Sequence, residues 1–190
     1  MIRIFFTGLG LTIILIGLSA TAGIYIFFKF GQSLPDYRQL ADYQPPVMTR
    51  VHAGDGRLLA EYAIEKRVFV PIEAMPKKVI QAFLAAEDKN FFTHAGIDLM
   101  GVARATFINL KNFGSSRRLV GASTITQQVA KNFLLTNEVS WRRKIKEAIL
   151  AIRIERAFPK TRILELYLNE IYLGFGSYGV AAAALNYFDK

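Results

Sequence analysis

The segment Trp141-Arg142-Arg143-Lys144-Ile145-Lys146-Glu147-Ala148-Ile149-Leu150-Ala151-Ile152 decides how the rest of the chain is arranged. Its second half is almost wholly apolar, which is typical of a helix that is buried on every side. Its first half places one carboxylate among four cations. Arg143 and Lys144 precede Glu147 by four and three residues, so the three side chains share one helix face. We therefore predict a central helix over residues 140–157, with its charged end at a cleft and Glu147 kept ionised by Arg143.

The rest of the chain after Pro76 is also expected to be helical, which predicts a mainly α body. Apolar periodicity, with glycine and proline breaks, predicts further helices over residues 76–89, 98–112, 123–135, 161–173 and 179–188. The expected N-caps are Asp98, Ser123, Ser140 and Thr161.

The segment before this body has a different character. Asp55-Gly56 predicts a hairpin turn between strands at residues 48–51 and 58–61, and residues 68–70 predict a third short strand. Residues 30–48 are polar and contain three prolines, which predicts a linker with little room for a helix.

The N-terminal segment has no charged residue from Phe5 to Phe28. A bilayer core is spanned by about 20 apolar residues in a helix, so residues 9–28 are predicted to be a transmembrane anchor. The alternative is a cleaved signal peptide, because Ala20-Thr21-Ala22 resembles a cleavage site. The apolar run continues past that site, which favours the anchor.

Bulk composition narrows the partners. The net charge of +9 suits an anionic membrane or a phosphate-bearing substrate as well as nucleic acid, and the apolar N-terminal segment favours the first two. The chain has no cysteine, which excludes a thiol nucleophile, a zinc–thiolate site and a disulfide.

Glu87 is the first candidate for chemistry. It lies one turn after Phe83 and Leu84, where the apolar stripe of the predicted helix should continue. A carboxylate beside apolar surface, near a helix C-terminus, is suited to proton transfer. Asp88 is expected nearer the polar side of this helix. The alternative is a solvated acidic pair at a helix end, which is the commoner situation for a glutamate.

Two further segments bear on the site. Residues 121–132 begin a helix after a glycine loop, a natural place to hold an anion or sugar hydroxyls, or else an ordinary capped helix. Glu87 and Glu147, in different environments, form the general pattern for acid–base chemistry at a sugar centre. Cations around Glu147 can hold a phosphate or pyrophosphate, although a surface ion pair of little consequence is the alternative there.

Residues 174–179 match G-x-G-x-x-G, but the segment before them is helical, which excludes a dinucleotide fingerprint.

The order of these segments resembles that of the family 51 glycosyltransferases, the peptidoglycan polymerases. The matching motifs are residues 87–96 (E-D-x-x-F-x-x-H-x-G), 121–128 (G-x-S-T-I-T-Q-Q), 143–147 (R-K-x-x-E), 163–169 and 174–190. The stalk between residues 49 and 61 is similar to that of class A penicillin-binding proteins of the 1A type.

The resemblance implies a lysozyme-like transglycosylase domain with a transmembrane helix and a short β-rich stalk. Its parts would be residues 1–30 (cytoplasmic tip and anchor), 31–65 (linker and stalk) and 66–190 (glycosyltransferase domain, incomplete at its C-terminus). No Ser-x-x-Lys, Ser-x-Asn or Lys-Thr-Gly triplet of a transpeptidase occurs, so we expect an N-terminal fragment without that half. The catalytic part would face the periplasm from a single-pass anchor in the bacterial inner membrane.

The resemblance also implies a reaction, in which lipid II is polymerised into β-1,4 glycan with inversion and release of undecaprenyl pyrophosphate. Glu87 would deprotonate the acceptor hydroxyl. Glu147, with Arg143 and Lys144, would hold the leaving pyrophosphate, directly or through a divalent metal ion (Mg²⁺ or Mn²⁺). The residues expected to contact substrate are Asp88, Phe91, His94, Ser123, Thr124, Gln127, Gln128, Lys131 and Asn132.

The expected partners are lipid II, the growing glycan strand, inner-membrane lipids at residues 100–120 and cell-wall synthesis proteins, with no nucleic acid. Two alternative functions stay open. One is a lysozyme-like lytic hydrolase, which would not need the cations around Glu147. The other is an inactive membrane-anchored module that binds lipid II.

Overall fold

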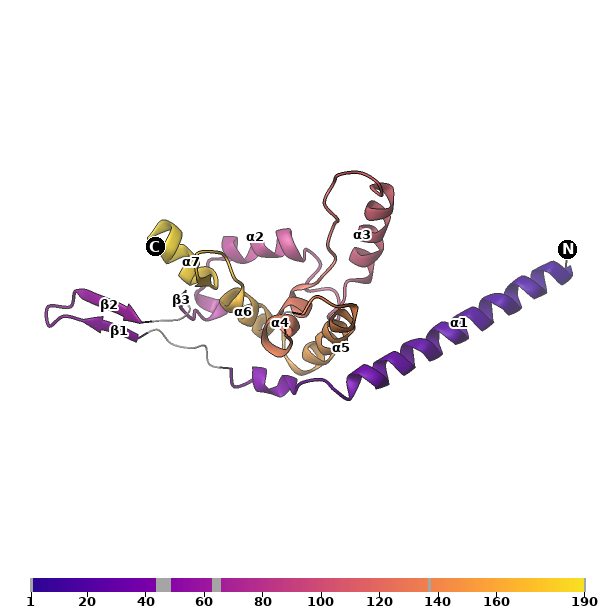
Figure 1. The fold of residues 1–190 in the computed structure, drawn as a ribbon, viewed down its shortest axis with the longest axis horizontal. Helices are drawn as coiled ribbons and strands as arrows, with labels where there is room; N and C mark the ends of the chain where they lie inside the picture. The colour runs from indigo at the N-terminus through magenta and orange to yellow at the C-terminus, as the bar shows by residue number, and fades with distance from the viewer. Residues whose placement is uncertain (1, 44–48, 63–65, 137, 190) are drawn as a thin grey trace.

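The computed structural model describes residues 2–43, 49–62, 66–136 and 138–189. A helical body lies at the centre, with one long helix and one hairpin extending from it in opposite directions (Figure 1). The α-helices are α1 (Ile2–Gly31), α2 (Lys77–Glu87), α3 (Leu99–Lys111), α4 (Ile125–Leu134), α5 (Trp141–Ala157), α6 (Lys160–Glu170) and α7 (Val180–Phe188). The strands are β1 (Thr49–His52), β2 (Leu58–Tyr62), β3 (Lys66–Arg67) and β4 (Ser177–Tyr178), and the 3-10 helices are η1 (Tyr37–Leu40) and η2 (Ile72–Ala74).

The core of the body is formed by α4, α5 and α6. Leu150 and Ile154 of α5 are fully buried, and so are Val129 of α4 and Leu168 of α6. Each such side chain stabilises the fold by about 1.5–3 kcal/mol through the loss of apolar surface from water. The predicted central position of residues 140–157 is confirmed.

The predicted helices are all present, with no end shifted by more than three residues. The N-caps Asp98 and Ser140 are confirmed by their bonds to the amides of Gly101 and Arg143. The other two N-cap predictions are wrong. Thr124, not Ser123, is the N-cap of α4, because the reciprocal capping box joins the cap to the residue three positions later, which is Gln127.

The second wrong cap is Thr161. Pro159 is the N-cap of α6, and Thr161 lies inside the first turn. The ring of Pro159 holds φ at −67°, a value compatible with helix entry, so the helix begins before Thr161.

The predicted hairpin is confirmed. Strands β1 and β2 pair antiparallel, with Thr49 opposite Tyr62, and Gly56 takes a positive φ of 85° in the turn. The third strand is misplaced in the prediction, because β3 ends at Arg67 and pairs in parallel with β4.

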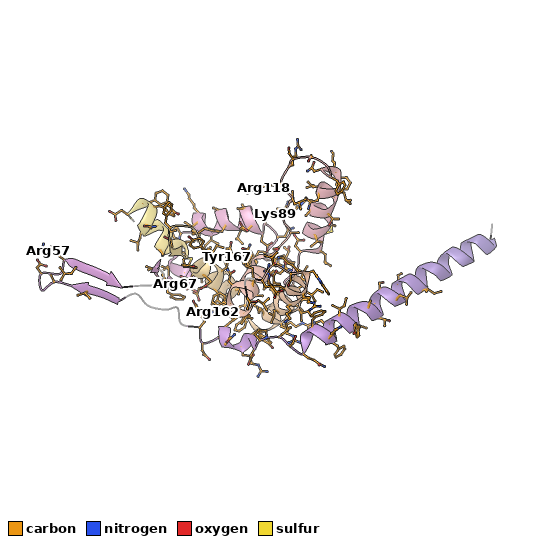
Figure 2. The ribbon with its side chains drawn as sticks, viewed as in Figure 1. Arg57, Arg67, Lys89, Arg118, Arg162 and Tyr167 are labelled. Carbon is orange, nitrogen blue, oxygen red and sulfur yellow. The ribbon has the colours of Figure 1, made fainter. Side chains whose placement is uncertain are left out.

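Residues 68–70 are held by a side chain and not by a strand. The buried amide of Asn169 accepts a bond from the Val70 amide at 2.8 Å and donates to the Val70 carbonyl at 2.9 Å. Nearby, the Arg67 guanidinium forms a double ion pair with Glu170 and lies 4.4 Å from the centre of the Tyr178 ring (Figure 2). Long-range side-chain bonds of this kind leave no pattern in the local sequence.

The interpretation of residues 30–48 as a linker with little room for a helix is wrong for its first half. Helix η1 forms there, and Leu40 is 1% exposed within the core. The carbonyl oxygens of Leu40 and Ala41 both accept bonds from Arg162 of α6. This segment therefore belongs to the body, whereas residues 44–48 lie outside the described residues.

The contacts of helix α1 with the body that involve described side chains lie at its C-terminal end. The Phe30 ring lies edge-on to Trp141 at 5.9 Å, and Arg153 of α5 donates to the Gly31 carbonyl at 3.2 Å. Within the described ranges, no helix meets the length and apolar content needed to cross a membrane. The transmembrane anchor predicted for residues 9–28 is therefore not confirmed.

The cap of α3 gives a pH-dependent prediction. Bonds from the Gly101 amide and then from Asn90 lower the pKa of Asp98 below its ordinary value. A lowered pKa contributes stability above the ordinary pKa of about 3.9, and this stability is lost as the pH falls. We expect Asp98→Ala to cost about 1 kcal/mol of unfolding free energy at pH 7, and the cost should shrink towards pH 3.

Denaturant unfolding followed by circular dichroism at pH 7, 5 and 3.5 measures this cost. The control is Asp42→Ala, which removes an exposed carboxylate elsewhere. An Asp98→Ala cost that stays the same at all three pH values would contradict the prediction.

Candidate active site

Glu87 lies at the end of α2 and lines a cavity of about 200 Å³, together with the start of α3 and residues 120–124. Its Oε2 accepts a hydrogen bond from the Gln128 side chain of α4 at 2.9 Å. The expected continuation of a buried stripe at Glu87 is wrong, since Glu87 is exposed and the buried carboxylate is Asp88. The reason is that the helix ends at Glu87, and Asp88 leaves helical geometry with φ −157° and ψ 75°. This turn directs Asp88 inward.

Asp88 joins three segments of the chain. Its carboxylate lies 3.0 Å from Nε2 of His94 and accepts a 3.0 Å bond from the amide of Ile125, the first residue of α4. Nδ1 of His94 accepts from the Gly96 amide, so the hydrogen-bond network assigns the imidazole proton to Nε2. Both side chains are almost fully buried. The polar atoms of Asp88 and His94 thus bind the protein itself, and their contact with substrate stays a prediction from the resemblance.

Thr124 has a similar internal role. It is 2% exposed, donates its hydroxyl proton to the Gly96 carbonyl at 2.7 Å and accepts from the Gln127 amide. Gln127 Oε1 accepts from the Thr124 amide in return. At Gly96, with φ 95°, an added Cβ would lie 2.8 Å from the Ala151 carbonyl carbon, so this close approach requires glycine. Thr124 therefore fixes the start of α4 at the edge of the cavity, and its contact with substrate stays a prediction from the resemblance.

The rest of α4 presents polar side chains. Gln128, Lys131 and Asn132 share one face at spacings of three and four residues, and all three are half-buried. Gln128 contacts Glu87, whereas the side chains of Lys131 and Asn132 form no hydrogen bond with any residue that the structure describes. The face therefore retains unused donors next to the cavity residue Glu87.

Glu147 is the centre of a second cluster. It is 1% exposed, one oxygen is paired with Arg143, and the other is 2.7 Å from the ammonium of Lys144. Lys144 also donates to the Ser123 hydroxyl at 2.9 Å, and half of its side chain is exposed. The predicted ion pair is confirmed. Both oxygens of Glu147 are buried and paired with cations, so its contact with a pyrophosphate stays a prediction from the resemblance.

Phe91 is the last of the residues that the resemblance predicts to contact substrate. It is fully buried, lies edge-on to Phe92 at 5.1 Å and carries the Lys160 ammonium 4.3 Å from its ring centre. The Phe91 side chain has no exposed surface, and its contact with substrate stays a prediction from the resemblance. Phe91 packs beneath the loop that carries His94.

Comparison with known proteins decides the family. The transglycosylase family matches residues 55–190. This chain belongs to the transglycosylase family. The predicted resemblance to the glycosyltransferase domain of penicillin-binding proteins of the 1A type is confirmed.

The chain is similar over most of its length to several proteins named penicillin-binding protein 1A. It is 60% identical to penicillin-binding protein 1A of Rickettsia prowazekii (strain Madrid E) over 178 residues, 94% of this chain and 22% of the relative. The identity is 48% to penicillin-binding protein 1A of Aquifex aeolicus (strain VF5), over 88% of this chain and 23% of that relative. It is 42% to the protein of that name in Escherichia coli (strain K12), over 98% of this chain and 21% of the relative. The chain thus spans about a fifth of the length of these relatives.

Sequence reasoning missed two residues that support the transglycosylase site. Lys160 donates to the His94 carbonyl at 2.8 Å and to Glu155 at 2.7 Å, and Glu155 also accepts from Thr126 at 2.6 Å. These bonds join the loop that carries His94 to α4, α5 and α6. A lysine and a glutamate five residues apart, with Pro159 between them, give no local signal for such a junction.

Tyr167 is a third residue that the sequence did not single out by itself. It is 1% exposed and lies within the body on α6, with its ring edge-on to Phe83 at 6.2 Å (Figure 2). Burial, and secondly the negative charge of Glu87, raise the pKa of Tyr167 above its ordinary value. Its hydroxyl therefore keeps its proton at any physiological pH.

The side chains around Glu147 do not form a metal site. Among the described residues, no group of three histidine, aspartate or glutamate side chains is placed to hold an ion. Both oxygens of Glu147 are occupied by cations, which a divalent ion would have to displace. A metal ion that arrives on the substrate's pyrophosphate stays a prediction from the resemblance.

The Asp88 junction gives a testable prediction. In Asp88→Asn, the new side-chain NH2 group would replace an oxygen that lies about 3 Å from Nε2 of His94, so its protons would face the Nε2 proton. If the imidazole proton moved to Nδ1 instead, it would face the proton of the Gly96 amide. An unsatisfied buried group costs about 1–3 kcal/mol. We expect a loss of that size in unfolding free energy, measured by urea titration.

The matched control is Glu87→Gln, the neighbouring exposed carboxylate, which should change the unfolding free energy by no more than about 0.5 kcal/mol. Equal stabilities for the two variants would show that Asp88 does not hold the site together.

Proposed function

We propose that this chain is a peptidoglycan glycosyltransferase, which polymerises lipid II into β-1,4 glycan strands with inversion and releases undecaprenyl pyrophosphate. One observation carries the proposal. The start of α4 lies between an exposed carboxylate, Glu87, and a half-exposed cation, Lys144, each bonded to a residue in or next to that helix. A base on one side and a cation on the other match a reaction that removes a hydroxyl proton and releases an anion.

The base is assigned by elimination among the cavity's carboxylates. Asp88 is buried and bonded within the protein, and Asp98 caps α3 and accepts from Asn90. Glu87 is therefore the carboxylate of this cavity with an exposed oxygen. The Gln128 amide orients it by donating to Oε2. In the proposed step, the other oxygen takes the proton of the acceptor sugar's hydroxyl as that hydroxyl attacks the anomeric carbon.

The leaving pyrophosphate is assigned to Lys144. Its ammonium is held between Ser123 and the buried Glu147, so its position is fixed before substrate arrives. Glu147 is then a residue that positions Lys144, and its carboxylate is also paired with Arg143. Lys131 and Asn132, on the α4 face next to Gln128, supply further donors on the donor side.

Membrane placement is part of the same proposal. Leu99, Met100, Phe107, Leu110 and Phe113 of α3 and the residues after it are between 68% and 90% exposed. Cations at Arg104, Lys111, Arg117 and Arg118 accompany them. This combination suits the boundary between acyl chains and anionic headgroups.

Helix α1 also exposes apolar side chains, among them Ile24 and Phe28. Both α1 and α3 extend from the body away from the β1–β2 hairpin (Figure 1). We propose that α1 is a single-pass inner-membrane anchor within residues 1–30. Residues 31–65 form the linker and stalk, of which the η1 segment packs on the body, and residues 66–190 form the glycosyltransferase part on the periplasmic side. Lipid II and the growing strand would then be reached at the membrane surface.

The direct test is turnover of labelled lipid II by the chain in detergent micelles. Glu87→Gln is expected to lower the rate about 10²–10⁴-fold, the usual contribution of a general base. Glu73→Gln, an exposed acid on η2, is the matched control and should turn over normally. Near-normal turnover by Glu87→Gln would refute the base assignment.

The same assay separates the alternatives. Cleavage of isolated cell wall without lipid II would support a lytic hydrolase in place of the polymerase. Saturable binding of lipid II with no polymer would support a binding module.

Glu147→Gln tests the positioning role. Breaking a buried ion pair costs about 3–5 kcal/mol of unfolding free energy. Lys144 is half exposed and can be solvated by water, so we expect a cost at the lower end of this range. We expect a loss of stability together with a rise in KM for lipid II, because Lys144 loses its fixed position. Glu138→Gln, at an exposed acid just before α5, is the control. A stability loss with unchanged kinetics at saturating and limiting lipid II would reduce Glu147 to a purely structural ion pair.

A further inference from the structure

A second cavity, of about 360 Å³, lies where the end of α1 meets the start of α5. It shares no lining residue with the cavity at Glu87. Lys29 of α1 and Arg142, Arg143 and Lys146 of α5 line it, against a single carboxylate, Glu138. The cavity is therefore strongly cationic, and nothing in the proposed reaction uses it.

The cations of this cavity are largely uncompensated. Arg143 is committed to Glu147. By contrast, Lys29, Arg142 and Lys146 form no ion pair with any residue in the described ranges. Lys29 and Arg142 lie over the Tyr25 and Trp141 rings, at 5.4 and 5.8 Å from the ring centres. Like charges gathered in one cavity repel each other, and a bound anion removes that cost.

The surroundings of the cavity indicate which anion it takes. Phe27 and Phe28 of α1 are 41% and 64% exposed just before Lys29, and Trp141 is 64% exposed at the rim. The contact of Phe30 with Trp141 and the bond from Arg153 to the Gly31 carbonyl fix this end of α1 against α5. Apolar helix surface, followed by a tryptophan and a group of cations, is the composition of a membrane–water boundary.

We propose that this cavity binds the headgroup phosphate of an anionic phospholipid such as phosphatidylglycerol. Arg142, Lys146 and Lys29 would donate to the phosphodiester oxygens, and the acyl chains would lie along the exposed Phe27 and Phe28. The proposal rests on the membrane placement of α1 given above, and not on the transferase chemistry. The substrate's pyrophosphate is separate, because its proposed cation, Lys144, is directed to Ser123 at the other cavity.

The chain provides its own probe, since Trp141 is its single tryptophan. We would titrate the full chain, in micelles of a neutral maltoside detergent, with dihexanoyl phosphatidylglycerol and follow tryptophan emission. A saturable shift is expected. Dihexanoyl phosphatidylcholine and inorganic phosphate should bind at least tenfold more weakly, because one lacks the net charge and the other lacks the acyl chains. Equal binding of inorganic phosphate would overturn the lipid assignment in favour of a free-anion site.

The variant Lys29→Gln/Lys146→Gln removes two cations and leaves Arg142 on the Trp141 ring. It should weaken phosphatidylglycerol binding at least tenfold, given about 1 kcal/mol for each cation near a headgroup. The matched control is Lys77→Gln/Lys78→Gln, which removes the same charge from the exposed start of α2 and should bind normally. An equal loss in both variants would mean that overall charge attracts the lipid, and the proposal would be wrong.

Three further outcomes separate this proposal from the proposed function. Displacement of phosphatidylglycerol by inorganic pyrophosphate would assign the cavity to the leaving group and overturn the headgroup site. A wild-type chain that polymerises lipid II without any response to phosphatidylglycerol would also overturn it, and would leave the transferase proposal intact. A saturable lipid response without polymerisation would support the headgroup site and count against the transferase.

Discussion

The carboxylate of Asp88 is the interaction on which the rest of the site depends. It receives bonds from His94 and from the first amide of α4, at the point where α2 ends. Three segments that are distant in sequence therefore meet at one buried negative charge. The position of Glu87 follows from this junction, because the neighbouring residue can only point outward once Asp88 has turned inward. The proposed base is thus oriented by its buried neighbour.

Buried charge is used in the same way elsewhere in the body. Glu147 and Glu155 are both almost fully buried, and each accepts from a lysine that also bonds another segment. Such pairs contribute little net stability, since desolvation offsets most of their attraction. Their value here is geometric, because each fixes the direction of an ammonium group. Lys144 is held towards Ser123, and Lys160 is held towards the loop that carries His94.

The two cavities differ in their charged side chains and are proposed to bind different ligands. The one at Glu87 has a carboxylate with a free oxygen, whereas the one between α1 and α5 has a surplus of positive charge and a border of aromatic side chains. Helix α5 contributes to both clusters, with Lys144 facing Ser123 and Lys146 facing the α1 end. A single helix thus relates the proposed transfer site to the proposed lipid surface, at a spacing that its rigid backbone fixes.

The sequence by itself determined the helices, the central place of α5 and the Arg143–Glu147 pair, because periodicity, caps and one-turn spacing are local properties of the chain. It also determined the family, through motifs in a fixed order. Only the tertiary structure decided that Asp88 is buried and Glu87 exposed, that Phe91 and Thr124 are buried, and that Lys160 and Asn169 hold distant segments. Those facts depend on contacts between residues far apart in sequence, for which neither spacing nor composition carries a signal. Helical periodicity placed Glu87 on the apolar stripe, but the helix ends at that residue, and its last turn is set by the partner that Asp88 finds across the fold.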